Sequence, residues 1–214
     1  MLPFTADILF ATFAQQNREL WPAPLLVPVL AIAALLLTLR PVPGGGRVVS
    51  TLLAAAWLWT GLGYHVLRFA TINFAAPAYG IVFVIEGLML AWAGAVHGRL
   101  AFRFQGGPSG WVGLALALAA VVAYPFADRL AGHGWESVRL VGLAPEPTAA
   151  FTLGLLLLTE RRTPLHLHVI PFLWTLVAAA TAIILAIPQD LALPVAGLGG
   201  LGLALGKNGR SKRP

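Results

Sequence analysis

Residues 75–96 read AAPAYGIVFVIEGLMLAWAGAV, an apolar stretch long enough for a helix to cross a bilayer. Glu86, near its middle, is the only acidic residue deep inside any apolar stretch of the chain. A charge at that depth costs about 2.5–3.5 kcal/mol on insertion scales, so Glu86 needs a partner, a cavity or a proton. The stretch therefore predicts a membrane-spanning helix that keeps one acidic side chain away from lipid.

Three glycines of this stretch, Gly80, Gly87 and Gly94, recur every seven residues and lie on one side of the expected helix. Small residues let a neighbouring backbone approach closely inside a membrane. We therefore expect this helix to stand at the centre of a helical bundle.

The composition indicates a membrane protein. Of the 214 residues, 58% are hydrophobic and 10% are charged, whereas soluble domains carry roughly 25% charged residues. The basic clusters flank apolar stretches, which is typical of signals that orient a membrane protein, so the bilayer is the expected partner and nucleic acid is not. The chain has no cysteine, which excludes disulfides, thiol catalysis and cysteine metal sites.

The fold class expected from these patterns is all-α, a polytopic membrane bundle of about seven spans in a single domain over residues 1–206. An amphipathic helix, capped by Thr5, is expected to lie in the interface at residues 4–18. A basic, disordered tail is expected at residues 207–214. The expected spans are 21–39, 48–69, 73–96, 110–127, 148–159, 165–187 and 191–206.

The fifth expected span has only 12 residues, or about 18 Å of helix, against a hydrocarbon core of roughly 30 Å. Pro145 and Pro147 just before it disfavour a helix that continues upstream. We therefore predict that residues 132–148 fold back over the bundle instead of projecting into solvent.

The distribution of lysine and arginine predicts the orientation. The positive-inside rule places the more basic side in the cytoplasm, with the N-terminus outside, as expected for a multi-pass protein of a bacterial inner membrane. One side carries ten basic residues and the other four. The ten are Arg40, Arg47, Arg99, Arg103, Arg161, Arg162, Lys207, Arg210, Lys212 and Arg213; the four are Arg18, Arg68, Arg129 and Arg139.

With that topology, several polar residues gather at the outer end of the bundle and predict a polar pocket there. A helix that begins at Pro147 below the surface points its free N–H groups into this region, where they suit an anion or carboxylate. The alternative is that these side chains solvate loop ends and cap helices. The candidate residues are His65, Asn73, Tyr124, His133, Glu146, Thr148 and Asp190, with Glu136 and Gln189 beside them and Glu86 deeper in the bundle.

Glu86 permits two interpretations, a proton relay or substrate contact, and a protonated carboxyl hydrogen-bonded to a neighbouring helix. No lysine or arginine lies at matching depth in any expected span, so we expect a neutral carboxyl. His166 and His168 resemble a metal pair, but a spacing of two puts them on opposite sides of a helix. We therefore expect no metal and no cofactor.

Short motifs in a fixed order resemble a bacterial family of integral membrane proteins that is known only as a domain of unknown function. That family carries a cysteine where this chain has Glu146, and often a glutamine near Glu86. Its members are sometimes labelled permeases without a demonstrated substrate, so the resemblance implies a membrane fold and no activity. The motifs are LPFT near the start, WPAP at 21–24, GYH at 63–65, IN at 72–73, YP at 124–125, GH at 132–133, PEPT at 145–148, Phe151–Thr152, IP–LW at 170–174 and Asp190 before AGL.

The leading functional hypothesis is a small transporter, or permease-like protein, with an extracytoplasmic polar pocket for a small molecule or an ion. The first alternative is an intramembrane enzyme that uses His65, Glu86 or His133, although the sequence leans away from catalysis. The second is a non-catalytic membrane scaffold or sensor. The sequence leaves the substrate and the oligomeric state open.

Overall fold

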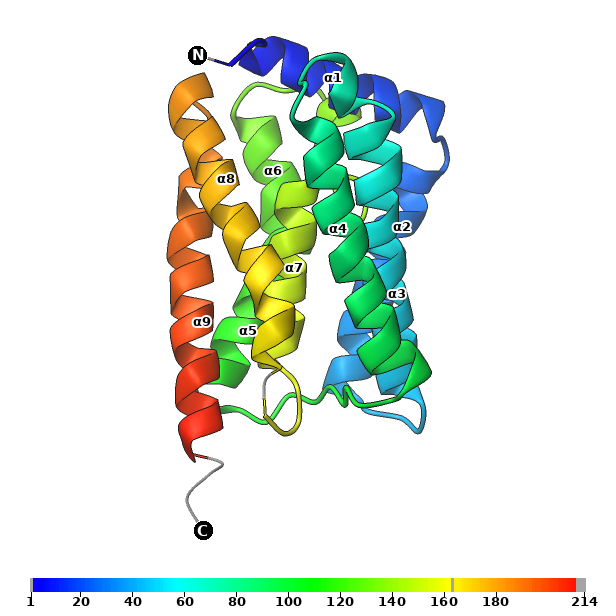
Figure 1. The fold of residues 1–214 in the computed structure, drawn as a ribbon, viewed down its shortest axis with the longest axis vertical. Helices are drawn as coiled ribbons and strands as arrows, with labels where there is room; N and C mark the ends of the chain where they lie inside the picture. Colours follow the sequence, from blue (N-terminus) through cyan, green and yellow to red (C-terminus); the bar gives the residue numbers. More distant parts are fainter. Residues whose placement is uncertain (1, 163, 211–214) are drawn as a thin grey trace.

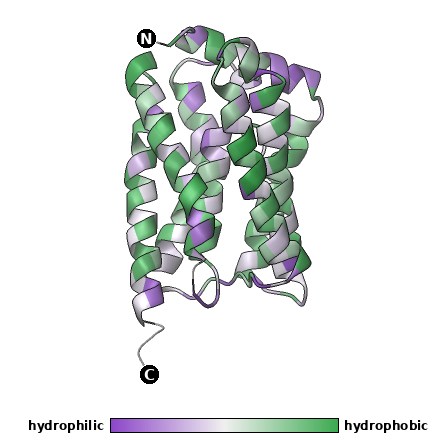
Figure 2. Ribbon diagram, in the orientation of Figure 1, coloured by the Kyte–Doolittle hydropathy of each residue, from purple (hydrophilic) through white to green (hydrophobic). Residues whose placement is uncertain are grey.

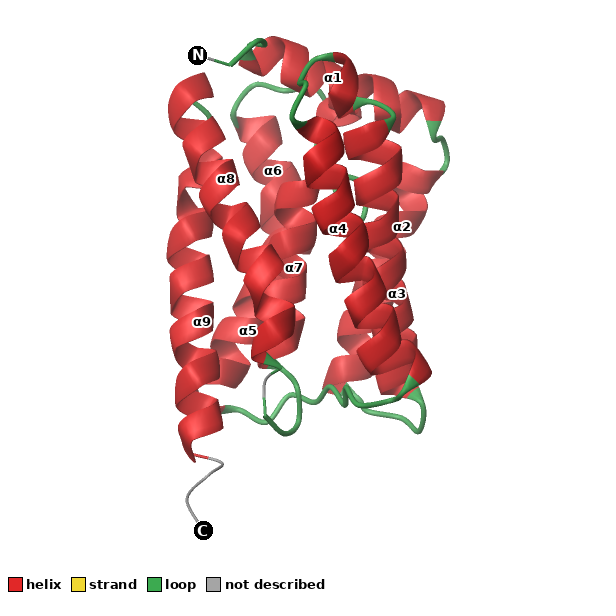
Figure 3. Cartoon of the chain, viewed as in Figure 1, coloured by secondary structure: helices red, strands yellow, loops and turns green. Residues whose placement is uncertain are grey.

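A computed structural model describes residues 2–162 and 164–210 of the chain, and these residues form no β-strand (Figure 3). Two isolated bridges, Phe102 with Thr159 and Val141 with Ala144, are the β-type pairings within these ranges. The expected all-α fold class is confirmed. The elements in chain order are α1 (Ala6–Glu19), α2 (Ala23–Leu39), α3 (Gly45–Trp59), η1 (Thr60–Val66), η2 (Phe69–Thr71), α4 (Ala76–Leu90), η3 (Ala91–Val96), α5 (Gly107–Leu118), η4 (Ala119–Ala123), α6 (Tyr124–Leu130), η5 (Trp135–Ser137), α7 (Pro145–Leu157), η6 (Leu165–His168), α8 (Val169–Leu185), η7 (Pro188–Ala192) and α9 (Leu193–Arg210).

The helices from α2 to α9 run along the long axis of the molecule, and α1 lies across one end of them (Figure 1). The axis of α1 makes an angle of 91° with that of α2. Thr5 caps α1, because its hydroxyl oxygen accepts a hydrogen bond from the Ile8 backbone N–H at 3.4 Å. We call the end that α1 covers the α1 end, and the opposite end, where the chain finishes, the tail end.

Four of the described helices are long and apolar enough to cross a membrane, and counting the bent α1–α2 pair as one span makes five. The seven expected spans are therefore not confirmed. Hydrophobic residues run along the length of the helices, as a membrane protein requires, whereas α1 carries many hydrophilic ones (Figure 2). The four helices are Ala76–Val96, Gly107–Leu130, Leu165–Leu185 and Pro188–Gly209.

The central helix of the bundle is α7, and the expectation that residues 75–96 would form the centre is wrong. All but one of the α7 residues are buried, whereas α4 exposes Ile81, Ile85 and Leu88 on its outer side. The sequence PEPTAAFTLGLLL is apolar or small on every side after its first turn, and a helix without a polar face belongs in the interior. Its short length fits this position, because it starts below the α1 end.

The glycines of α4 and η3 have the predicted packing role. A Cβ atom on Gly80, Gly87 or Gly94 would collide with the facing segment, which runs from α3 into η1. The obstacles are the Gly61 carbonyl oxygen, the Leu58 side chain and the Ser50 side chain. The two segments therefore pack at backbone distance, and the small residues make this possible.

The predicted break before α7 is confirmed. Helix α7 begins at Pro145, and residues 138–144 form a buried non-helical segment that turns at Gly142, where φ is +85°. Two threonines satisfy the backbone of this turn: Thr60 Oγ1 donates to the Gly142 carbonyl at 3.3 Å, and the Gly142 N–H donates to Thr148 Oγ1 at 2.7 Å. Non-helical backbone at this depth is tolerated because protein surrounds it. We call residues 138–144 the re-entrant segment.

The expected disordered tail, residues 207–214, is wrong for its first four residues. Helix α9 continues to Arg210, so residues 207–210 are helical and not disordered, and residues 211–214 lie outside the described part of the chain. Lys207 Nζ donates to the carbonyl oxygens of Leu157 and Thr159. These carbonyls lie at and just beyond the end of α7, where a cation is favourable. Lys207 therefore fastens α9 to the central helix.

Candidate functional site

A completely buried arginine occupies the α1 end of the bundle. Arg139 is 1% exposed and comes from the re-entrant segment. Its guanidinium clasps Asp128 with two hydrogen bonds, from Nε to Oδ2 at 3.0 Å and from Nη2 to Oδ1 at 2.6 Å. Nη1 donates to Asp190 Oδ2 at 2.7 Å. Such forked, charge-assisted bonds to carboxylates are among the strongest hydrogen bonds in proteins.

A third carboxyl group, that of Glu146, approaches the same guanidinium. Glu146 Oε2 lies 3.7 Å from Arg139 Nη1, which is too long for a hydrogen bond, and this oxygen is buried without another partner among the described residues. Asp128 and Asp190 thus hold the guanidinium by hydrogen bonds, and the carboxyl group of Glu146 is the one left without such a bond. We call Arg139, Asp128, Asp190 and Glu146 the ion centre.

Two neutral side chains also donate hydrogen bonds to the carboxylates of the ion centre. The Tyr124 hydroxyl donates to Asp190 Oδ1, and the Tyr124 ring lies 4.9 Å from the Arg139 guanidinium carbon. Gln189 Nε2 donates to Asp128 Oδ1 at 3.2 Å. Burial lowers the pKa of the Arg139 guanidinium, but its acidic neighbours outweigh that effect and hold this pKa well above its usual value. The arginine is therefore permanently charged.

Helix α1 covers the ion centre. The ring of Phe10, on its buried side, lies 5.0 Å from the Arg139 guanidinium carbon. The His133 ring stacks on the Phe10 ring, with the two centroids 3.4 Å apart. Gln16 Nε2 donates to the Leu143 carbonyl, and Asn17 Nδ2 donates to the carbonyls at positions 136 and 138. Hydrogen bonds from the buried side of α1 therefore hold this helix on the re-entrant segment.

The four residues of the ion centre all come from places where a helix ends or the backbone is irregular. Asp128 lies in the last turn of α6, Arg139 in the re-entrant segment, Glu146 in the first turn of α7 and Asp190 in η7. The chain reaches η7 through a sharp turn at Ala186, whose φ is +54°. Inside membranes, such interruptions gather where a protein binds ions or polar solutes.

The structure brings together three of the residues that the sequence singled out. Tyr124, Glu146 and Asp190 meet at Arg139. His133 joins their surroundings through Phe10, and partial burial lowers its pKa. Three of the candidate residues therefore meet in a closed, charged cluster.

The side chains of two other candidates make hydrogen bonds to backbone groups. Thr148 Oγ1 accepts from Gly142 N–H and donates to the Ala144 carbonyl, which shapes the turn of the re-entrant segment. Asn73 Oδ1 accepts from the Ala75 N–H at 3.0 Å and so caps the approach to α4. For these two residues the structure shows the capping alternative.

His65 and Glu86 lie apart from the ion centre. His65 is enclosed by aromatic rings, with centroid distances of 4.6 Å to Phe83 and 5.0 Å to Trp174. Glu86 lies one turn beyond Phe83 on α4 and is fully buried. His65 and Glu86 have no hydrogen-bond partner within the described chain, nor do Trp174 Nε1 and His168 Nε2. We call His65, Glu86, His168 and Trp174 the mid-bundle set.

Two essential members of the ion centre, Arg139 and Asp128, were missed from the sequence as site residues. Arg139 entered only the prediction of membrane orientation, as one of the four basic residues expected on the outer side. A signal was nevertheless present, because Arg139 stands between the apolar stretches of a segment predicted to fold back, where a charge needs a partner. That argument indicates a buried pair, but it does not select the partners.

A family model described as a family of unknown function, DUF6064, matches residues 6–213, which is nearly the whole chain. No curated protein and no solved structure matches the chain.

Proposed function

The chain belongs to this family of unknown function, and we propose that it is a small membrane permease that exchanges a proton for a cationic solute. The observation that carries the proposal is the ion centre, in which one guanidinium faces three carboxyl groups. Buried ionisable groups are costly inside a membrane protein and typically mark the path of a proton or a substrate.

The charges of the ion centre favour a proton or a cationic solute over an anion. With every group ionised, three carboxylates outnumber one guanidinium, and the surplus is negative. Glu146 makes no hydrogen bond to Arg139, unlike the two aspartates, so it is the group that gains and loses the proton in our proposal. A cationic solute that reaches the centre would therefore compete with that proton, which couples the two.

In our proposal, helix α1 controls access to the ion centre. Arg139 and Asp128 are almost completely buried beneath it, so this arrangement is a closed state in our proposal. Opening requires Phe10 to leave the guanidinium and Gln16 to leave the Leu143 carbonyl, while the bundle below stays packed. An amphipathic helix lying across the bundle can lift from it without disturbing any span.

We also propose the finer topology that the sequence predicts. In it, seven spans, formed by α2, α3–η1, α4–η3, α5–η4–α6, α7, α8 and α9, cross a bacterial inner membrane. The N-terminus and the ion centre face outward, and the tail end faces the cytoplasm. A reporter fused after residue 209 should be active only as a cytoplasmic reporter. Activity of an exported reporter at that position would reverse the orientation.

Charge displacement during a pH jump tests the function. Proteoliposomes on a solid-supported membrane should give a transient current when the external pH is stepped across neutrality. Glu146→Gln should remove most of that current, because an amide does not bind the proton. Glu136→Gln changes an exposed carboxylate near the same end and should leave the current intact.

Addition of small organic cations to the same vesicles, compound by compound, identifies the solute. A transported cation should carry current in the parent protein and less in Glu146→Gln. If the parent gives no transient current at any pH, or if both variants match the parent, the proton-linked permease is refuted.

A further inference from the structure

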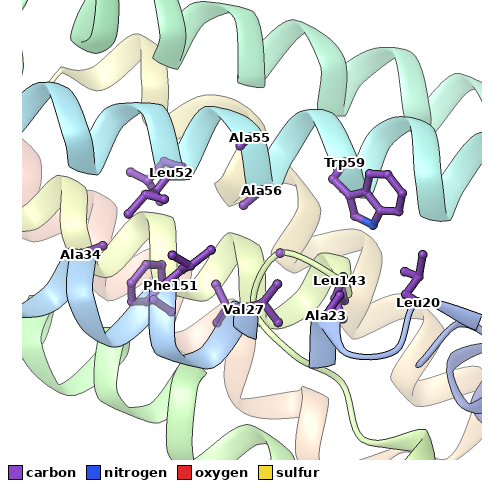
Figure 4. Close-up of a pocket in the computed structure, with 15 residues that line it drawn as sticks. Leu20, Ala23, Val27, Ala34, Leu52, Ala55, Ala56, Trp59, Leu143 and Phe151 are labelled. Carbon is purple, nitrogen blue, oxygen red and sulfur yellow. The ribbon is translucent and has the colours of Figure 1, made fainter. Parts of the chain in front are cut away.

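An apolar slot of about 310 Å³ lies between α2 and α3 (Figure 4). Ala34 and Leu52 line one end of it, and Leu20 and Trp59 line the other, at the α1 end. The seven steps from Leu52 to Trp59 along α3 correspond to about 10 Å of helix, so the slot is long and runs along the bundle.

The slot is accessible from the outer surface of the bundle. Leu30 and Trp59 on its rim are 47% and 41% exposed, and Ala55 on its wall is exposed. Its floor is formed by Phe151 of the central helix and by Gly142 of the re-entrant segment. In a membrane this face meets hydrocarbon, so an elongated apolar slot of this kind suits an alkyl chain.

An ion pair stands at the α1 end of the slot. Arg68 Nη2 lies 3.1 Å from Glu19 Oε2, and Arg68 Nη1 donates to the Gly63 carbonyl at 2.7 Å. Glu19 precedes Leu20 of the lining, and Gly63 packs against the Trp59 ring. The side chains of Arg68 and Glu19 stay 18% and 48% exposed. The pair therefore offers a guanidinium to a phosphate and a carboxylate to an ammonium group.

We infer that this slot binds one acyl chain of a phospholipid, with the headgroup at the Arg68–Glu19 pair. The carbon lining receives the chain, Arg68 receives the phosphate and Glu19 receives the ammonium of a zwitterionic headgroup such as ethanolamine. This charge complementarity at one end of an apolar slot selects a phospholipid over a second protein. The lipid would rest on the re-entrant segment and hold Gly142 beneath it.

Native mass spectrometry of the full chain tests the inference. The protein is released from nanodiscs that contain equal amounts of phosphatidylethanolamine and phosphatidylglycerol, and the retained lipids are counted. Ala55→Phe places a ring in the slot and should lower lipid retention about tenfold, since loss of two buried methylenes suffices for that factor. Ala115→Phe, at an exposed alanine of α5 outside the slot, is the matched control and should retain lipid like the parent.

The headgroup is tested by two further variants in the same nanodiscs. Arg68→Gln should weaken retention of both lipids, whereas Arg129→Gln, at an exposed arginine of the same end, should not. Glu19→Gln should reduce phosphatidylethanolamine selectively. If Ala55→Phe retains as much lipid as Ala115→Phe, the slot is not a lipid site. If Arg68→Gln and Glu19→Gln leave the amounts of both lipids unchanged, the headgroup assignment is wrong.

Discussion

The ion centre and the mid-bundle set are both buried, yet they treat their polar groups in opposite ways. In the ion centre Arg139 makes hydrogen bonds to two carboxylates and contacts a third. In the mid-bundle set, both carboxyl oxygens of Glu86 and both ring nitrogens of His65 are buried without a hydrogen-bond partner among the described residues.

The backbone around each group explains the difference. The ion centre takes its residues from helix ends and from the re-entrant segment, where the chain can turn a side chain toward its partner. Glu86 lies within α4, and its depth and direction are set by the glycine contact between α4 and α3. A charged state is therefore possible in the ion centre, whereas the mid-bundle set is suited to neutral side chains.

The largest expected effect comes from removing the single cation of the ion centre. Arg139→Met keeps much of the side-chain volume but leaves Asp128 and Asp190 buried without a counter-charge. Breaking a buried ion pair in this way costs about 3–5 kcal/mol. Thermal unfolding in detergent should therefore begin at a much lower temperature, or the variant should fail to accumulate.

Arg129→Met is the control for this substitution, because Arg129 is exposed near the same end. It should unfold within about 0.5 kcal/mol of the parent. Equal stability of Arg139→Met and Arg129→Met would mean that the ion centre does not hold the fold together.

A partnered neutral pair inside the bundle provides an intermediate case. Trp57 Nε1 donates to Thr152 Oγ1 at 2.8 Å, and both side chains are buried. Trp57→Phe removes this bond and leaves a small cavity, so it should lower stability by about 1–3 kcal/mol. Trp111→Phe, at an exposed tryptophan, should cost far less in the same unfolding assay. Equal costs would show that the Trp57–Thr152 bond contributes nothing.

The sequence predicts those parts of the fold that depend on local chemistry. Prolines at 145 and 147 disfavour a helix that continues upstream of them, and glycines at heptad spacing allow close packing against a neighbour. For this reason the break before α7 and the glycine face of α4 follow from the residues alone. The cap at Thr5 follows in the same way.

Other features depend on which segments meet in space, and these the sequence does not determine. Asp128 and Arg139 are joined by a turn whose direction no local pattern specifies, so the pair becomes visible only in the fold. The central position of α7 is similar: its short length suggested a broken span, although its lack of a polar side also fits a buried helix. Tyr124, Glu146 and Asp190 were selected because they were expected at one end, and not because any spacing joins them.

The smallest expected effect concerns Glu86 and tests the other side of the comparison. Both carboxyl oxygens of Glu86 lack a hydrogen-bond partner among the described residues, so Glu86→Gln and Glu86→Leu should both fold. The leucine variant should be at least as stable as the parent, because it no longer buries a polar group. Glu86→Ala should lose about 2–3 kcal/mol through the cavity alone, rather than through a partner left without its hydrogen bond. The infrared difference spectrum between the parent and Glu86→Gln should show a protonated carboxyl band near neutral pH. A leucine variant that unfolds as readily as the alanine variant would show that the carboxyl group has a partner, and the contrast with the ion centre would then be lost.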